Sequence, residues 1–281
     1  MPDHCPLVGV VVLNYRGAAD TVRCLDALAA VEPGPVVVVV DNASGDGSVE
    51  RIRAAAPDVE LVVNDANLGF AGGCNAGIDR LRASGVELVW LLNNDTTVEP
   101  STLRAMVDVA AADDRIGAVG SVIYDMAEPD RVLTWGGGRV GRRTGFTRDA
   151  RSPHDRVDYL TGASVLLRLA ALDDVGGLDP RFFFTWEDVD LGVRLTDSGR
   201  RLAVAERSRV WHRWGGSLPS LSPVRMEHHA TGVVLFMRKH SAVPALSALP
   251  MLAWYALTAV RQRSWAIGAA AWRGWRRGWR A

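Results

Sequence analysis

The sequence has no surplus of charge of either sign. Its 32 basic and 32 acidic residues cancel, so no long-range positive field draws the chain to nucleic acid, and we expect no nucleic-acid partner. Lysine is nearly absent, since Lys239 is the single lysine and the other basic residues are arginine. The three cysteines are an odd number without metal-ligand spacing, and no signal peptide precedes the first expected strand. We therefore expect a reduced, cytoplasmic protein.

Long hydrophobic runs are also scarce. Residues 242–260 are almost wholly apolar, but Pro244 and Pro250 interrupt them, so we expect this segment to lie on a membrane or pack on one rather than to cross a bilayer. From Arg261 onward there are six arginines and four tryptophans without an acid. On a helix these tryptophans fall within an arc of about 80°. Two readings stay open: peripheral membrane contact, or packing on the protein itself or on a twin subunit in a homodimer.

The first hundred residues alternate apolar strands with helical segments, which predicts an α/β fold with a mostly parallel sheet and right-handed crossovers. We expect strands at 7–13, 36–40, 59–63 and 86–92, and helices at 18–30, 48–56 and 71–83. A Gly- and Arg-rich segment up to residue 151 favours a hairpin or a mobile loop, and strand character returns at 159–167. The chain divides into one large domain, 1–240, and a helical, Trp- and Arg-rich appendage, 241–281.

A first acidic cluster, Asn93-Asn94-Asp95, follows an apolar strand, so Asp95 should emerge at the strand's carboxyl end, where open α/β sheets bind ligands. Mg²⁺ or Mn²⁺ needs few carboxylates when diphosphate oxygens and water complete its shell. We interpret Asp95 as the ligand and Asn93 as a weaker neutral partner. The alternative is an Asn-rich turn.

A second cluster, Glu187-Asp188-Val189-Asp190, opens a predicted helix about ninety residues later. Asp188 is our candidate general base, and Glu187 and Asp190 compete for the role. Helix capping explains acids at this position but not the aromatic run before them. We interpret Trp186 as a wall of an acceptor pocket, with core packing as the alternative.

Three further motifs lie at expected strand ends or helix starts. Asp41 and Asn42 follow a valine run, and a carboxylate there can accept hydrogen bonds from a base or a ribose. The small residues of NLGFAGGCNAGI let backbone amides approach a ligand, although this is not a Rossmann fingerprint. His212 follows a short apolar strand and could complete a metal shell, with Arg213 available for phosphate. Turn, packing and structural roles remain the alternatives.

Together these motifs resemble the family 2 glycosyltransferases, especially their bacterial rhamnosyltransferase-like branch. The strings that carry the resemblance are VVVVDNASGDGS, NLGFAGGCNAGI, LLNNDT, YLTGASVLLR, VGGLDPRFFFTWEDVDLGVRL and WHRWGGS, and they span about residues 7–240. The resemblance implies a GT-A fold, a nucleoside-diphosphate sugar donor, a divalent metal and inversion at the anomeric carbon.

By this resemblance, Asp41 matches the acid that contacts the base, Asn93-Asn94-Asp95 matches the Asp-x-Asp metal motif, Asp188 matches the base and His212 matches a metal ligand. The first position of the metal motif is Asn here, a departure from the stricter pattern. The residues that we assign to nucleotide binding are Asn14, Asp41, Asn42, Asn67, Gly69, Asn75 and Asn94.

The predicted function is transfer of a sugar from a dTDP or UDP donor, with rhamnose as the first candidate, to a hydroxyl of a glycan, a lipid-linked intermediate or a natural product. Such an enzyme would work in the cytoplasm or on the inner face of the cell membrane. Two alternatives stay open: a sugar nucleotidyltransferase, which should carry a basic Gly-rich loop after its first strand, and a non-catalytic membrane-associated scaffold.

Overall fold

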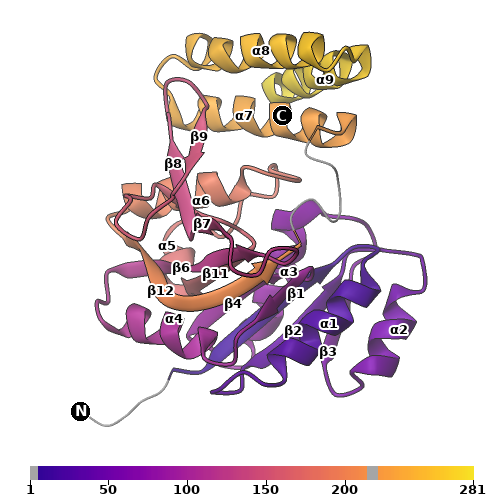
Figure 1. The fold of residues 1–281 in the computed structure, drawn as a ribbon, viewed down its shortest axis with the longest axis vertical. Coiled ribbons are helices and arrows are strands. Elements are labelled where there is room, and N and C mark those ends of the chain that lie inside the picture. Colours follow the sequence, from indigo (N-terminus) through magenta and orange to yellow (C-terminus); the bar gives the residue numbers. More distant parts are fainter. Residues whose placement is uncertain (1–5, 214–220) are drawn as a thin grey trace.

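The computed structural model describes residues 6–213 and 221–281. One large sheet runs through it in the order β3-β2-β1-β4-β11-β6-β12-β5, with β7 paired to β6 at the side (Figure 1). Its strands are β1 (Val8–Asn14), β2 (Val36–Asp41), β3 (Glu60–Val63), β4 (Leu88–Asn93), β5 (Thr96–Val98), β6 (Ile116–Asp125), β7 (Val132–Trp135), β11 (Ser164–Arg168) and β12 (Arg201–His212). The helices on and beside this sheet are α1 (Ala18–Leu28), α2 (Ser48–Ala55), α3 (Gly69–Arg82), α4 (Thr102–Ala111), α5 (Leu169–Asp174) and α6 (Glu187–Asp197).

The amino-terminal half of the sheet follows the predicted βαβ order. Strands β3, β2, β1 and β4 pair in parallel, and α1 and α3 pack on β1 and its neighbours. Because helices cover both faces, the strands are apolar throughout, with Val10, Val12 and Val39 in one core and Val11, Val38 and Val40 in the other. The α/β prediction is confirmed, with strand and helix limits within a few residues of those expected.

The expected strand at 159–167 is wrong as a single element, because it splits at Thr161-Gly162. Its first part, β10 (Tyr159–Leu160), joins β8 (Gly137–Val140) and β9 (Thr147–Asp149) in a separate three-stranded sheet. Its second part, β11, runs antiparallel between β4 and β6. One apolar run thus serves two sheets, and a period-2 pattern does not reveal such a division.

The Gly- and Arg-rich segment forms the β8–β9 hairpin, which rises from the large sheet to a layer of helices (Figure 1). At its turn, Gly145 has a φ of +72°, and a Cβ there would lie 2.8 Å from Met251 Cγ and 3.2 Å from Met237 Cε. Glycine therefore lets the hairpin approach the helical layer closely.

Three carboxyl-terminal helices form that layer: α7 (Pro223–His240), α8 (Pro244–Arg261) and α9 (Trp265–Arg280). α7 packs against both other helices, and a shared apolar cluster joins the layer to Phe182 and Trp186 of the large domain. The predicted domain division at residue 240 falls between α7 and α8, inside this layer. Across the described ranges 6–213 and 221–281, no helix has both the length and the apolar character to cross a bilayer.

Candidate active site

The carboxyl ends of β1, β2 and β4 carry a network of buried polar side chains. Strand register sets Asn14 beside Asp41, and Asn14 Nδ2 donates to Asp41 Oδ2 at 2.6 Å. Ser44 N and Oγ also donate to the Asp41 carboxylate, at 3.0 and 2.7 Å. Asn94 Nδ2 donates to Thr21 Oγ1 at 3.0 Å and lies 3.5 Å from Asn14 Oδ1. The ends of β1, β2 and β4, with the motifs at Asp41 and Asn94, therefore meet at one edge of the sheet.

The side chain of Asn42 joins the loop before α3 to the edge of the sheet formed by the ends of β1, β2 and β4. Its Nδ2 donates to Asn67 Oδ1 at 2.9 Å and to the carbonyl of Gly69 at 3.0 Å, while its Oδ1 accepts the backbone N–H of Leu68 at 3.1 Å. Asn42 is only 2% exposed. These contacts give it a clear structural role, the positioning of the loop that opens α3.

Asn75 lies apart from this network. Its Nδ2 donates to the carbonyl of Leu178 at 2.8 Å and its Oδ1 accepts the N–H of the same residue at 3.2 Å. Both ends of the side chain thus bind α3 to the segment before α6. We assign Asn75 this structural role in place of the nucleotide contact expected from the sequence.

The structure brings Asp95 and His212 together. Antiparallel pairing of β5 and β12 sets His212 opposite Thr96, and His212 Nε2 lies 3.0 Å from Asp95 Oδ1. Each residue is 8% exposed. A carboxylate with an imidazole is a donor set that suits Mn²⁺ or Mg²⁺ in part. No group of three or more His, Cys, Asp or Glu side chains in residues 6–213 and 221–281 is arranged for a metal, so substrate oxygens or water would have to complete the shell.

Arg213, expected to be available for phosphate, forms an ion pair with Asp20 on α1. Its backbone N–H also donates to the carbonyl of Asp95 at 3.0 Å. The ion pair ties the end of β12 to α1, and the backbone hydrogen bond ties it to the Asp95 turn.

Glu187 and Asp188 begin α6 and have different surroundings. Asp188 is partly exposed and accepts two backbone N–H groups, from Gly162 at 3.1 Å and Val189 at 2.8 Å. Glu187 is buried, and its Oε2 has no hydrogen-bond partner within the described part of the chain. Burial first, and then the neighbouring Asp188 charge, raise the pKa of Glu187 well above its usual range. Burial also raises the pKa of Asp188.

Two residues with left-handed backbone precede the acids. Thr185 has a φ of +71° and Trp186 a φ of +75°, which side chains with a Cβ rarely adopt and which is especially strained for β-branched threonine. Trp186 is 3% exposed and packs against Phe236 and His229 between α6 and α7. Its ring lies in the core, so we assign it a packing role in place of the expected acceptor-pocket wall.

Asp190, the third candidate base, has a structural role. It is fully buried, forms ion pairs with Arg194 Nε and Lys239 Nζ, both at 2.7 Å, and makes a hydrogen bond with His240 Nε2 at 2.8 Å. Burial opposes its charge, yet the hydrogen bond from His240 and these cations keep the pKa of Asp190 below its usual value. The carboxylate holds α6 to α7.

Gly162 and Ala163, which separate β10 from β11, connect the two acidic clusters. Gly162 N–H donates to Asp188, and the Ala163 carbonyl accepts the N–H of Asn93 at 3.0 Å. Two consecutive backbone groups thus link the start of α6 to the end of β4. The aromatic run before α6 is tied to the start of α3, since Phe183 O accepts the Phe70 N–H at 2.7 Å.

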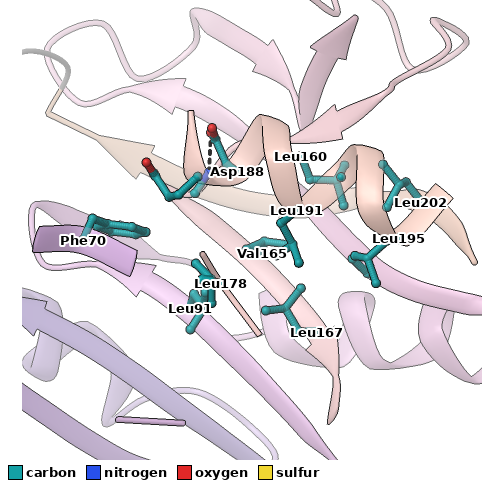
Figure 2. A pocket seen from close by; sticks show the side chains of 14 residues that line it. Phe70, Leu91, Leu160, Val165, Leu167, Leu178, Asp188, Leu191, Leu195 and Leu202 are labelled. Carbon is teal, nitrogen blue, oxygen red and sulfur yellow. Dashed lines mark hydrogen bonds between the residues drawn. The ribbon is translucent and has the colours of Figure 1, made fainter. Parts of the chain in front are cut away.

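Two cavities lie beside this region. The first, of about 20 Å³, is lined mainly by leucines and has Asp188 at one end (Figure 2). It has room for about one water molecule, not a sugar. The second, of about 450 Å³, lies between the loop before α6 and the helical layer. It is lined by Arg181, Phe182, Phe183, Thr185, His228, Thr231, Gly232, Arg277 and Ala281.

Arg225, at the start of α7, was not expected from the sequence. It is half-buried, and its guanidinium lies 5.7 Å from the ring centre of Phe184. Its positive charge acts on Glu187 and partly offsets the rise in the pKa of that carboxyl. Burial lowers the pKa of this arginine from its ordinary value. Arg225 lies in none of the motifs, and Gly162 lies within the string YLTGASVLLR but was not singled out there, so only the folded arrangement identifies the contacts of both residues.

Comparisons with known proteins agree on one family. A family model described as glycosyltransferase-like family 2 matches residues 5–227. An N-acetylglucosaminyl-diphospho-decaprenol L-rhamnosyltransferase from Mycobacterium tuberculosis is 29% identical over 268 residues, which cover 86% of each chain. Galactofuranosyltransferase GlfT1 from Mycolicibacterium smegmatis is 27% identical over 204 residues, 70% of this chain and 67% of that protein.

Two solved structures share the fold. Mannosyltransferase PcManGT from Pyrobaculum calidifontis, in complex with GDP-Man and Mn²⁺, has a TM-score of 0.62 at 19% identity, over 99% of this chain and 88% of its own. GalNAc-T7 with UDP, GalNAc and Mn²⁺ has a TM-score of 0.64 at 15% identity, over 83% of this chain and 48% of its own.

Proposed function

The chain belongs to glycosyltransferase family 2 and has the GT-A fold, and from this premise we propose that it transfers L-rhamnose from a nucleoside-diphosphate donor to a lipid-linked glycan. The donor would be a dTDP or UDP sugar. The proposal draws its sugar and its acceptor class from the mycobacterial relative, whose name states both and which matches most of this chain. An acceptor of this kind would place the enzyme at the inner face of the cell membrane.

Asp188 is the proposed general base. Two backbone N–H groups favour its charged form, whereas the deeper burial of Glu187 and the neighbouring charge of Asp188 favour the protonated form of Glu187. Asp188 would remove the proton from the acceptor hydroxyl as that oxygen attacks the anomeric carbon and the bond to the diphosphate breaks. A single displacement of this kind inverts the anomeric configuration.

Asp95 and His212 would hold a divalent metal, and Asn93 remains a weaker candidate. Such an ion would neutralise negative charge that develops on the leaving diphosphate. Asn14, Asp41, Asn42, Asn67, Gly69 and Asn94 would form the base and ribose side of the donor site, because their network occupies the adjoining strand ends. Arg225 is the cation that we propose for a substrate phosphate, because it lies half-buried at the start of α7 and its charge acts on Glu187, the residue next to the proposed base.

The acceptor would enter through the 450 Å³ cavity. Its wall includes Phe183 and Thr185, which belong to the loop directly before α6, the helix that carries the proposed base. The Phe183 ring stacks on His228 at 5.0 Å, and such a flat surface suits a sugar ring. The Thr185 Oγ1 is buried without a hydrogen-bond partner within the described part of the chain and could bind a sugar hydroxyl.

The observation that carries the proposal is the Gly162-Ala163 link, because it sets the proposed base at the end of the strand that leads to the metal motif. A panel of nucleotide sugars, tested by thermal shift with Mn²⁺, should single out one donor, since a ligand that binds the folded state raises the melting temperature. Transfer from that donor to a lipid-diphosphate acceptor tests the reaction itself. If no sugar nucleotide stabilises the protein or is hydrolysed, the scaffold alternative is favoured.

A further inference from the structure

Among the described elements, α8, the outermost helix at the top of Figure 1, carries the largest number of exposed large apolar side chains. Every exposed side chain of α8 before Arg261 is apolar. Leu246 is 65% exposed, Leu249 50%, Leu257 47% and Val260 72%. At 100° per residue these four residues and Ala253 fall within an arc of about 80°, so they form one stripe, which we call the α8 stripe.

The opposite side of α8 packs in the core. Ser247, Ala248, Met251 and Tyr255 are buried, and Tyr255 Oη lies 2.6 Å from His229 Nδ1 on α7. The helix therefore cannot rotate to hide the α8 stripe without breaking these contacts. The exposed apolar side chains are a fixed feature of the fold, and such a patch on a folded protein marks a binding surface.

Tryptophan and arginine border the α8 stripe. Trp265, which begins α9, is 94% exposed, and Arg261 and Arg263 directly before it are also exposed. Residues 241–281 contain no acid. An apolar stripe with tryptophan at its end and cations beside it is the composition of a helix that lies in a membrane interface.

Only some of the four tryptophans of α9 are exposed and can contact a membrane. Trp275 is 7% exposed and packs in the core with Trp279, their ring centres 6.3 Å apart, so the four tryptophans of α9 do not share one outer surface. Of the two readings left open for these tryptophans, packing on the protein itself is therefore the one that applies to Trp275 and Trp279. Trp265 and Trp272 remain exposed.

We propose that the α8 stripe, with Trp265, Arg261 and Arg263, docks the protein on an anionic lipid surface. Charge favours a lipid surface over a second copy of the chain as the partner. Two copies that met through this face would bring two arginine-bearing surfaces without acids together, and like charges repel. Anionic headgroups complement these arginines, while the apolar side chains enter the boundary of the acyl region. This inference rests on exposed residues far from the proposed base and does not depend on the sugar transferred.

Flotation with lipid vesicles tests the proposal. The full chain should float with vesicles of phosphatidylcholine and phosphatidylglycerol, and less with phosphatidylcholine alone. The double variant Leu246→Glu with Val260→Glu should lower the partition coefficient about tenfold or more, because two apolar contacts become charges. The matched control is Ala54→Glu with Ala55→Glu, the same charge change at exposed positions of α2, at the other end of the molecule.

Three results would overturn the proposal: a wild-type chain that does not float, a double variant that floats as well as its control, or a dimer that the double variant abolishes while vesicle binding is absent. Transfer to a short-chain, water-soluble acceptor separates this proposal from the proposed function. The double variant should retain that transfer. A wild-type chain that floats but transfers no sugar would count against the function and leave the docking surface standing.

Discussion

The backbone N–H of Gly162 donates to Asp188 Oδ2 at 3.1 Å, and this bond fixes the proposed base at the break between two strands. Because the next residue pairs with Asn93, the orientation of Asp188 depends on the sheet and not on α6 alone. Replacing Asp188 with asparagine should keep the packing and remove the base. Turnover should fall about a hundred- to ten-thousand-fold, with donor KM nearly unchanged. Steady-state kinetics check this, and a rate within a few-fold of wild type would remove Asp188 from the mechanism.

The acid limb of the pH–rate profile should reflect the raised pKa of Asp188. A base must be deprotonated to act, so kcat should rise with pH through a value above that of an ordinary aspartic acid. The limb should disappear in Asp188→Asn, measured on its residual activity. A profile of the same shape in the variant would assign the titration to another group.

Glu187→Gln should stabilise the protein at neutral pH. Because the folded state raises the pKa of Glu187, this carboxyl retains its proton in the fold when the unfolded chain has lost it, so stability decreases as pH rises from the ordinary value near 4.5 through the raised one. Glutamine removes that cost. The melting-temperature gain should grow with pH across this window and vanish below it. A gain that is constant with pH would contradict the linkage.

Asp95→Asn and His212→Gln should weaken the stabilisation that Mn²⁺ gives together with UDP or dTDP. A tenfold loss of affinity costs about 1.4 kcal/mol of that stabilisation at saturating ligand. His154→Gln is the matched control, because His154 is exposed on a loop. Equal metal-dependent shifts in all three variants would reject the proposed metal site.

Arg225→Gln should raise the KM of the phosphate-bearing substrate, and Arg225→Lys should recover part of the loss because it restores the charge without the bidentate geometry. Arg104→Gln, a change at an exposed arginine of α4, is the control. A fall in melting temperature without a change in KM would show that Arg225 serves packing on Phe184 instead.

Asp190→Asn should act on stability, not on chemistry. Removing one partner from a buried ion pair typically costs about 3–5 kcal/mol, since the cations left behind lose their compensation. Below the lowered melting temperature, kcat should stay within a few-fold of wild type. A loss of turnover as large as that of Asp188→Asn, in a folded protein, would return Asp190 to the candidate bases.

Much of the amino-terminal half could be predicted, because uniformly apolar strands such as 36–40 and 86–92 alternate with helices of clear period. Asp95 and His212 were also expected from sequence, and β5–β12 pairing brings them together. The break at Gly162 was not foreseeable, since Gly162 lies within a continuous strand-like run. The different surroundings of the three acids were not foreseeable either, because they depend on partners distant in sequence, such as Lys239 and His240 for Asp190.

Lys239, the single lysine of the chain, links α7 to α6 through ion pairs. Lys239 Nζ lies 2.7 Å from Asp190 and 2.8 Å from Asp179, with its side chain 23% exposed. A protonated amine held by two carboxylates reacts slowly with acylating reagents, and the only other amine is the chain terminus. The rate at which Lys239 is acylated therefore reports how often these two helices separate, so local opening can be followed at a single native residue.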